Sequence, residues 1–288
     1  MSAESGSAGA GATEAGSAAG VAGSGPAAGA AGSGPAAGWR LAAGTLTRIP
    51  AGAIAQVTPR IARTAMTVGS AVMVPVALVA GLVGWGAVRL GAPGLVGGLL
   101  AVGIVAQLSR SIHWDGLADT ADGLGSSWDR DRALEIMRTG DVGPMGAGTL
   151  VVVLGLQAAS YGALLAGPWG WLVVAALVCA SRAALVLSCL RGVRPARPEG
   201  LGQAVAGSVR WYDAVVVWLV WAALLSGVAL VTGASWWTGV LAAAGGPVAA
   251  GVLLWWCVRR LGGITGDVLG ATVEAAAAGL AVLAVIVW

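Results

Sequence analysis

The sequence predicts an all-α fold, a polytopic membrane helical bundle of about seven transmembrane helices with a cytoplasmic N-terminus. Hydrophobic residues make up 57% of the 288-residue chain and charged residues only 10%, whereas a soluble domain usually carries about 25% charged residues. A bilayer is crossed by about 20 apolar residues. Windows of that kind recur along the chain at 67–88, 94–112, 147–166, 170–190, 214–232, 236–257 and 268–288.

Residues 1–38 differ in composition from the rest of the chain. The stretch AGSGPAAG occurs at 22–29 and again at 31–38, within a tract of Gly, Ala, Ser and Pro. Such a tract cannot bury enough apolar surface to offset its conformational entropy. We therefore predict a disordered leader at 1–38 and an integral membrane domain at 39–288.

The placement of arginine predicts the orientation of the spans, because positively charged connections stay on the cytoplasmic side. Among the connections between predicted spans, one side carries only Arg89. The opposite side carries Arg110, Arg130, Arg132, Arg138, Arg191, Arg194, Arg197, Arg210, Arg259 and Arg260. We expect that side to face the cytoplasm from the cell (inner) membrane. No basic run predicts binding to nucleic acid.

Acidic residues concentrate in one of these connections. Seven of the 13 carboxylates fall between 115 and 141, and HWDGLADTADG at 113–123 contains Asp115, Asp119 and Asp122. Their i, i+4, i+7 spacing places them within an arc of about 60° on a helix. Like charges so close repel one another, so we expect a cation between them, the alternative being a solvated acidic loop. Carboxylates without cysteine favour a hard ion such as Mg²⁺.

A second acidic pair lies in GGITGDVLGATVE at 262–274. Asp267 and Glu274 are seven residues apart and share one helical face. An ionised Glu274 inside a span is costly unless it is paired or solvated. We expect both carboxylates to join the three aspartates as metal ligands. The alternative is that Glu274 pairs with Arg182 as a packing device.

The remaining candidates are polar or small residues near these acids. Arg182 is the only arginine well inside a span; its fork suits bidentate phosphate binding, the alternative being extension to the membrane surface. His113, the only histidine, is a candidate general base, ligand or hydrogen-bonded interface residue, and we expect it to be catalytic together with the three aspartates. Gly116 and Gly123, which let backbone approach a ligand, complete the expected phosphate-binding set with Arg138.

Six stretches follow one another in the order of a known family. They are LTRIP (46–50), HWDGLADTADG (113–123), RDRALEIMR (130–138), SR (181–182), EGLG (199–202) and GGITGDVLGATVE (262–274). The sequence therefore resembles the adenosylcobinamide-GDP ribazoletransferases, also called cobalamin (5′-phosphate) synthases. After EIMR the family commonly has Asp-Ser-Arg-x-Gly, whereas Thr139 to Gly143 here read TGDVG.

The resemblance implies a Mg²⁺-dependent membrane enzyme that acts on adenosylcobinamide-GDP and α-ribazole, or its 5′-phosphate. GMP would leave and adenosylcobalamin, or its phosphate, would form, with Asp115, Asp119 and Asp122 holding metal and diphosphate, and Asp267 and Glu274 completing the site. Rival functions are a CDP-alcohol phosphotransferase, whose usual pattern has arginine where Asp119 stands, and a membrane prenyltransferase. A transporter is less consistent with acids outside the bilayer midplane. A homo-oligomer is left open.

Overall fold

The computed structural model describes residues 35–52, 54 and 56–288; the leader as far as residue 34 lies outside the described residues. Within the described part the chain forms thirteen helices and no strand. In chain order they are α1 (Pro35–Leu46), α2 (Pro59–Val72), α3 (Val74–Arg89), α4 (Gly94–Leu108), α5 (Ile112–Ser126), α6 (Arg130–Ile136), α7 (Pro144–Leu164), α8 (Gly170–Ser181), α9 (Ala184–Ser188), α10 (Gly200–Val205), α11 (Trp211–Val231), α12 (Trp236–Leu261) and α13 (Gly266–Val287).

The membrane-spanning segments agree with six of the seven predicted windows. The seventh window, 94–112, is only partly a span: α4 ends at Leu108, and the chain then bends by 95° into α5. The protein is thus a multi-pass membrane protein with six spans, or seven if α4 and α5 form one broken span. The six segments long and apolar enough to cross are Pro59–Arg89, Pro144–Leu164, Gly170–Ser188, Trp211–Val231, Trp236–Leu261 and Gly266–Val287.

The bend between α4 and α5 has a local cause in the backbone. Arg110 and Ser111 have φ angles of 61° and 54°, in the left-handed region that residues other than glycine seldom occupy. Two successive residues in this conformation turn the chain away from the axis of α4, and α5 begins directly afterwards at Ile112. The acidic connection predicted at 113–146 therefore starts as a helix.

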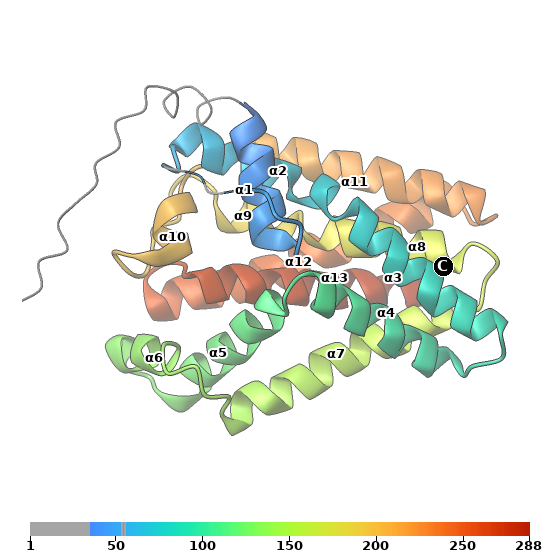
Figure 1. The fold of residues 1–288 in the computed structure, drawn as a ribbon, viewed down its shortest axis with the longest axis horizontal. Coiled ribbons are helices and arrows are strands. Elements are labelled where there is room, and N and C mark those ends of the chain that lie inside the picture. Colours follow the sequence, from blue (N-terminus) through green and yellow to red (C-terminus); the bar gives the residue numbers. More distant parts are fainter. Residues whose placement is uncertain (1–34, 53, 55) are drawn as a thin grey trace, which may run out of the picture. The chain divides into compact units, whose positions relative to one another are not determined.

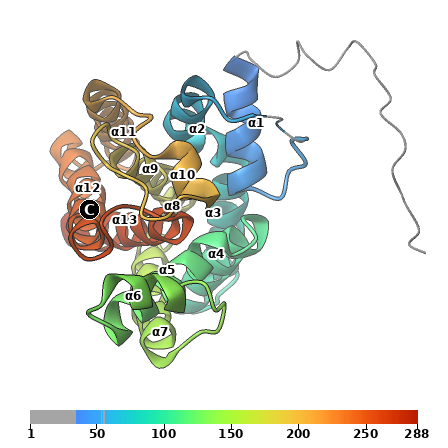
Figure 2. The same ribbon diagram turned by 90° about the vertical axis from the view of Figure 1, so that its left-hand side faces the viewer.

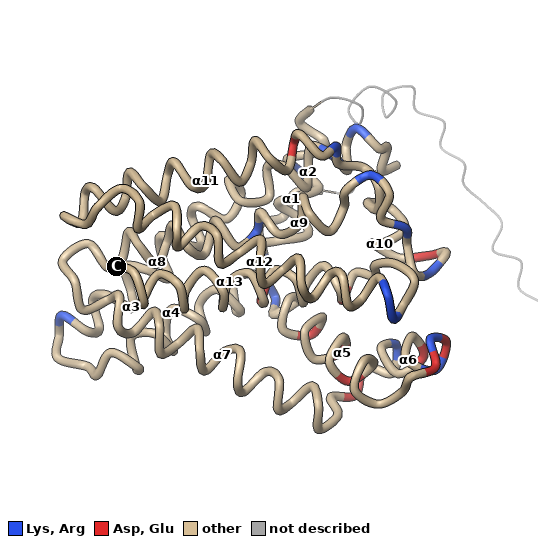
Figure 3. Tube along the Cα trace, turned by 180° about the vertical axis from the view of Figure 1, so that it is seen from behind, with Lys and Arg blue, Asp and Glu red and all other residues tan. Residues whose placement is uncertain are grey.

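The long helices lie alongside one another, and the short helices gather at one end of the bundle. Figure 1 shows α7, α11, α12 and α13 following the long axis, and Figure 2, seen along that axis, shows α5, α6 and α10 at the near end. Arginine and the acidic residues are concentrated at this same end (Figure 3). The bundle therefore has one charged end and an apolar body.

Small residues allow the spans to pack closely. A methyl group on Gly98 of α4 would overlap the backbone of Ala158 in α7, and one on Gly245 of α12 would overlap Gly279 in α13. Close backbone contact of this kind is the usual packing mode of membrane helices, where dispersion replaces the hydrophobic effect. The abundance of Gly and Ala in the predicted spans is explained by these contacts.

The predicted boundary at residue 38 falls inside α1. This helix begins at Pro35, a residue well suited to the first helical turn. Ala37 and Gly38 are buried, and a methyl group on Gly38 would overlap Thr64 of α2. Residues 35–38, which the composition assigns to the leader, therefore belong to the folded domain.

Candidate active site

Glycines bring α5 against the start of α13, and this contact creates the site. A Cβ on Gly116 would lie 2.6 Å from the carbonyl oxygen of Asp267, and a Cβ on Gly270 would lie 3.1 Å from the Cα of His113. Neither position has room for a side chain. The two acidic stretches predicted from the sequence are therefore neighbours in the fold.

Three carboxylates, those of Asp115, Asp119 and Asp267, meet near this crossing. Asp115 is exposed, whereas Asp119 is only 8% exposed. The charge of Asp119 interacts with the charges of Asp115, Asp267 and Asp122, and such like charges destabilise one another. Thr265, which caps α13, donates a hydrogen bond from its hydroxyl to Asp267 Oδ2 at 3.1 Å and so orients that carboxylate.

The guanidinium of Arg197 lies beside this acidic group. Its NH1 is 3.6 Å from Asp267 Oδ2, and its NH2 donates a hydrogen bond to the Leu134 carbonyl at 2.6 Å. Its Nε is buried without a hydrogen-bond partner in the described part of the chain. Burial lowers the pKa of Arg197 and the Asp267 charge opposes the shift, but a guanidinium remains protonated at any physiological pH. Arg197 therefore supplies one fixed positive charge at the site.

Arg197 reaches this position because its loop pairs with the segment before α13. The Ala196 amide donates to the Ile264 carbonyl at 2.8 Å, and the Ile264 amide donates to the Arg194 carbonyl at 2.9 Å. A methyl group on Gly263 would overlap the Arg194 backbone. Gly263 in GGITGD thus permits a close backbone approach, and what approaches is the 194–196 segment of the protein.

Asp122 has a different environment from the other two aspartates of α5. Its carboxylate accepts hydrogen bonds from the backbone amides of Gly143, at 2.7 Å, and Gly146, at 2.9 Å. These amides lie at the N-terminus of α7, where unpaired N–H groups and the helix dipole favour a negative charge. Asp122 therefore caps α7 from a distant part of the sequence; its role as a metal ligand stays a prediction.

His113, Arg182 and Glu274 form a polar cluster inside the bundle. Glu274 Oε2 accepts a hydrogen bond from Gln157 at 2.7 Å, and its Oε1 is 4.0 Å from His113 Nδ1. Arg182 NH2 is 3.5 Å from the same nitrogen, and Arg182 is only 1% exposed. All three side chains are buried and have protein partners. His113 is the predicted catalytic residue of the cluster, Arg182 the predicted phosphate-binding residue and Glu274 the predicted metal ligand.

The Arg182 side chain does not extend to the membrane surface. Its NH1 donates to the Val178 carbonyl at 3.0 Å and to the Ser181 hydroxyl at 2.8 Å. The residue lies at the break between α8 and α9. The sequence predicts one continuous helix there, over the window 170–190. Among the described residues no ion pair joins Glu274 directly to Arg182; the side chains of both lie beside His113 Nδ1 instead. The metal-binding role of Glu274 stays a prediction.

The remaining phosphate-binding candidates, Gly123 and Arg138, have different surroundings. Gly123 is packed against Met137 and the Ala133 carbonyl, which accounts for the absence of a side chain. Arg138 is exposed and its NH2 is 2.5 Å from Glu199 Oε1. It borders a cavity of about 320 Å³ that we call the arginine hollow, lined by Arg130, Asp131, Leu134, Glu135, Arg138, Ala196, Arg197 and Pro198.

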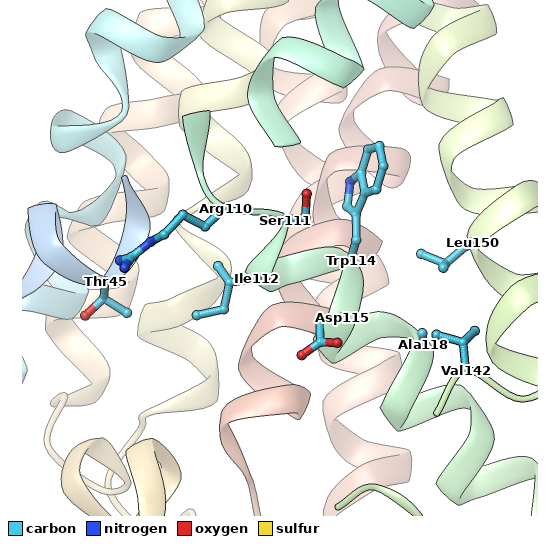
Figure 4. A pocket seen from close by; sticks show the side chains of 9 residues that line it. All are labelled: Thr45, Arg110, Ser111, Ile112, Trp114, Asp115, Ala118, Val142 and Leu150. Atoms are coloured by element: carbon cyan, nitrogen blue, oxygen red, sulfur yellow. The ribbon is translucent and has the colours of Figure 1, made fainter. Parts of the chain in front are cut away.

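A larger cavity of about 520 Å³ opens beside the exposed aspartate. We call it the apolar hollow; it is lined in part by Ile112, Trp114, Asp115, Ala118, Val142 and Leu150. Figure 4 shows the Trp114 ring directed toward α4, the Asp115 carboxylate at the opposite edge, and Leu150 entering from α7. The hollow thus ends at one of the three clustered carboxylates.

Arg197 is the site residue that the sequence reasoning missed. It lies two residues before the EGLG stretch, in RPARPEGLG, and a cation near that stretch was a usable signal. Sequence spacing places it among many loop arginines, and only the pairing of its loop with residues 262–266 singles it out.

The chain matches known proteins over nearly all of its described length. The family model for cobalamin-5-phosphate synthase matches residues 38–286. The chain belongs to the cobalamin-5-phosphate synthase family. It is therefore a transferase of cobalamin biosynthesis, and the rival functions considered from the sequence are not supported.

Individual relatives agree with the family match. The chain is 42% identical over 240 residues to the adenosylcobinamide-GDP ribazoletransferase of a Nocardioides species, covering 83% of this chain and 94% of that protein. It is 35% identical over 241 residues to the enzyme of the same name from Bradyrhizobium diazoefficiens, covering 81% and 86%. No solved structure matches this chain at a significant level.

Proposed function

We propose that the chain transfers the adenosylcobinamide phosphate group of adenosylcobinamide-GDP to α-ribazole or its 5′-phosphate. A hydroxyl oxygen of the ribazole forms a bond to the phosphorus that bears adenosylcobinamide. The bond from this phosphorus to the GMP oxygen breaks, GMP departs with the electron pair, and the hydroxyl proton is released. Adenosylcobalamin, or its 5′-phosphate, is the product. The names of the relatives supply the donor substrate.

The observation that carries the proposal is the meeting of three carboxylates and one guanidinium at the charged end of the bundle. Asp115 and Asp119 come from α5, Asp267 from α13, and Arg197 from the loop before α10. A diphosphate needs positive charge, and carboxylates alone would repel it. The arrangement is therefore suited to a diphosphate accompanied by a cation.

The chemistry of this carboxylate group fits Mg²⁺. The ion prefers oxygen ligands and usually keeps several waters, taking one or two carboxylates together with substrate phosphates. Among the described residues no group of three or more His, Cys, Asp and Glu side chains is arranged to hold a metal by itself, so the proposal requires that substrate phosphates and water complete the ion's coordination. Asp115, Asp119 and Asp267 are the residues we assign to it. When bound, it would neutralise phosphate oxygens and the leaving group.

The protein groups around the carboxylates would bind the diphosphate and hold the surrounding helices in position. Arg197, which lines the arginine hollow, would donate hydrogen bonds from its guanidinium to the diphosphate. Asp122 holds the start of α7 against α5. The buried cluster of His113, Arg182 and Glu274 joins α5, the end of α8 and α13, and so would hold these helices in register beside the carboxylates. These residues act by position, since proximity and orientation supply much of catalysis in phosphoryl transfer.

The proposal includes the location of the enzyme. The charged end of the bundle would face the cytoplasm from the cell membrane, because arginine-rich connections are retained there. The water-soluble substrates would then reach the site from the cytoplasm, while the apolar body of the bundle stays in the bilayer.

A turnover assay tests the proposed function. Membranes with the protein, adenosylcobinamide-GDP, α-ribazole and Mg²⁺ should release GMP and form a new corrinoid. Chelation with EDTA should abolish turnover and added Mg²⁺ should restore it. Asp119→Asn should lower kcat by about 100-fold, the scale of removing one preorganised charge-stabilising group, whereas the exposed Asp141→Asn should retain wild-type turnover. Undiminished turnover in Asp119→Asn, or in EDTA, would contradict the metal assignment.

A further inference from the structure

Two cavities of different chemistry flank the clustered carboxylates. The apolar hollow includes Asp115 in its wall, and the arginine hollow includes Arg197. Asp115 and Arg197 both interact with Asp267: Arg197 NH1 lies 3.6 Å from its Oδ2, and the charge of Asp115 acts on its carboxyl group. A substrate with a diphosphate at its centre therefore meets different surroundings at its two ends.

The apolar hollow suits a large, flat and amphipathic group. Ile112, Ala118, Val142 and Leu150 supply apolar walls and Trp114 supplies an aromatic face. Its volume of about 520 Å³ falls in the range in which proteins bind cofactor-sized molecules. Its polar lining consists of Asp115, Thr45, Ser111 and Arg110. The Arg110 guanidinium donates a hydrogen bond to the Gly44 carbonyl and lies toward Thr45 (Figure 4), so it is already partnered by the protein.

The arginine hollow suits an anionic nucleotide. Its volume of about 320 Å³ is bordered by three arginines, Arg130, Arg138 and Arg197, and by two carboxylates, Asp131 and Glu135. Both carboxylates are paired with arginine, Asp131 with Arg130 at 3.0 Å and Glu135 with an arginine outside the hollow at 2.6 Å, which leaves positive charge in excess. Guanidinium groups bind phosphate oxygens bidentately and stack on planar rings. The carboxylates near it, such as Glu199 paired with Arg138 at 2.5 Å, are acceptors of the kind that the N–H groups of a guanine base require.

We propose that the donor substrate binds in one direction across the site, with the corrinoid ring in the apolar hollow and the guanosine monophosphate end in the arginine hollow. The diphosphate then lies over Asp115, Asp119 and Asp267. This inference rests on the proposed function and adds to it the two subsites and their order. GMP leaves from the arginine hollow, while the corrinoid remains beside α5 and α7 to receive the ribazole.

The first test fills the apolar hollow. Leu150→Trp should raise KM for adenosylcobinamide-GDP by about tenfold, corresponding to roughly 1.4 kcal/mol of lost binding. The inhibition constant of added GMP and the KM of α-ribazole should stay at wild-type values. Leu156→Trp is the matched control, because Leu156 lies on the same helix, is 46% exposed and is outside the hollow. Should Leu150→Trp fail to fold, Val142→Trp, in the loop before α7, tests the same wall.

The second test removes a charge from the arginine hollow. Arg138→Gln should weaken inhibition by GMP by about tenfold, the scale of one hydrogen bond to a charged group. Arg259→Gln is the control, because Arg259 is exposed in the last turn of α12, lies over the Trp255 ring and does not line the hollow. GMP alone serves as the probe for this end, so the two substitutions have separate readouts.

The outcomes distinguish the inference from the proposed function. Wild-type protein without turnover would remove both. If the wild type turns over but the substitutions change neither KM for adenosylcobinamide-GDP nor the inhibition constant of GMP, the two subsites are refuted and the proposed function stands. The opposite direction of binding would follow if Leu150→Trp weakened inhibition by GMP. Arg138→Gln would then raise KM for adenosylcobinamide-GDP and leave inhibition by GMP unchanged.

Discussion

The crossing of α5 and α13 makes a quantitative prediction at Gly116. In Gly116→Ala the new Cβ would lie 2.6 Å from the carbonyl oxygen of Asp267, about 0.8 Å inside the 3.4 Å at which ordinary contact begins. The obstacle is backbone, so the helices must separate by a large part of this distance. Overpacking of this kind costs about 1 to 3 kcal/mol of stability. A displacement near 1 Å at a catalytic centre can cost about 100-fold in rate.

We therefore expect Gly116→Ala to lower kcat by about 10- to 100-fold, because Asp115 and Asp119 move away from Asp267. The assay is release of GMP by equal amounts of purified protein in detergent, with thermal unfolding measured on the same samples. Gly155→Ala is the control: no atom lies within 4 Å of a Cβ there, and alanine favours a helix by about 0.5 to 1 kcal/mol over glycine. Gly155→Ala should keep full activity.

Two results would refute this reasoning. Gly116→Ala with wild-type kcat would show that the distance between the two acidic stretches does not govern the reaction. An equal loss of kcat in Gly155→Ala would show that the effect comes from replacing any helical glycine. Lower stability with unchanged kcat would separate packing from catalysis and would count against the site.

Two further predictions concern stability, measured by thermal unfolding in detergent. Asp122→Ala should destabilise the protein by about 1 to 2 kcal/mol, because the amides at the start of α7 lose their acceptor, and Asp122→Asn should cost less; equal melting of Asp122→Ala and wild type would exclude the cap. Arg182→Met should cost about 1 to 3 kcal/mol, because the Val178 carbonyl and the Ser181 hydroxyl lose their donor and Glu274 loses a nearby positive charge. Adding Glu274→Gln to Arg182→Met should recover part of the loss, and a further loss in the double variant would contradict the coupling of the two charges.

Hydropathy predicted the spans well because it is a property of contiguous residues. The windows at 147–166, 214–232 and 236–257 differ from α7, α11 and α12 by only a few residues at each end. The bend at Arg110 and Ser111 was not predictable in this way, since it lies in the backbone angles of two ordinary residues. The same holds for the break at Arg182, where the sequence reads as an unbroken apolar run.

For the candidate site, the spacing of residues along one helix could be read from the sequence, whereas the contacts between helices could not. The i, i+4, i+7 pattern correctly placed Asp115, Asp119 and Asp122 on one face of a helix, because helical geometry depends only on local sequence. It treated the three as equivalent. Asp122 accepts hydrogen bonds from amides at the start of α7, whereas Asp119 is close enough to Asp267 for their charges to interact, so their surroundings differ.

The sequence by itself determined that this is a helical membrane protein with two acidic stretches and one arginine-rich side, because composition, hydropathy and helical periodicity are all written locally. The tertiary structure alone decided that Arg197 joins Asp267, that Arg182 and Glu274 are buried with His113, and that the acids lie between an apolar and a basic hollow. Each of these contacts joins segments far apart in the chain. They depend on close backbone contacts at glycines such as Gly116 and Gly263, and these contacts form only when the whole bundle is packed.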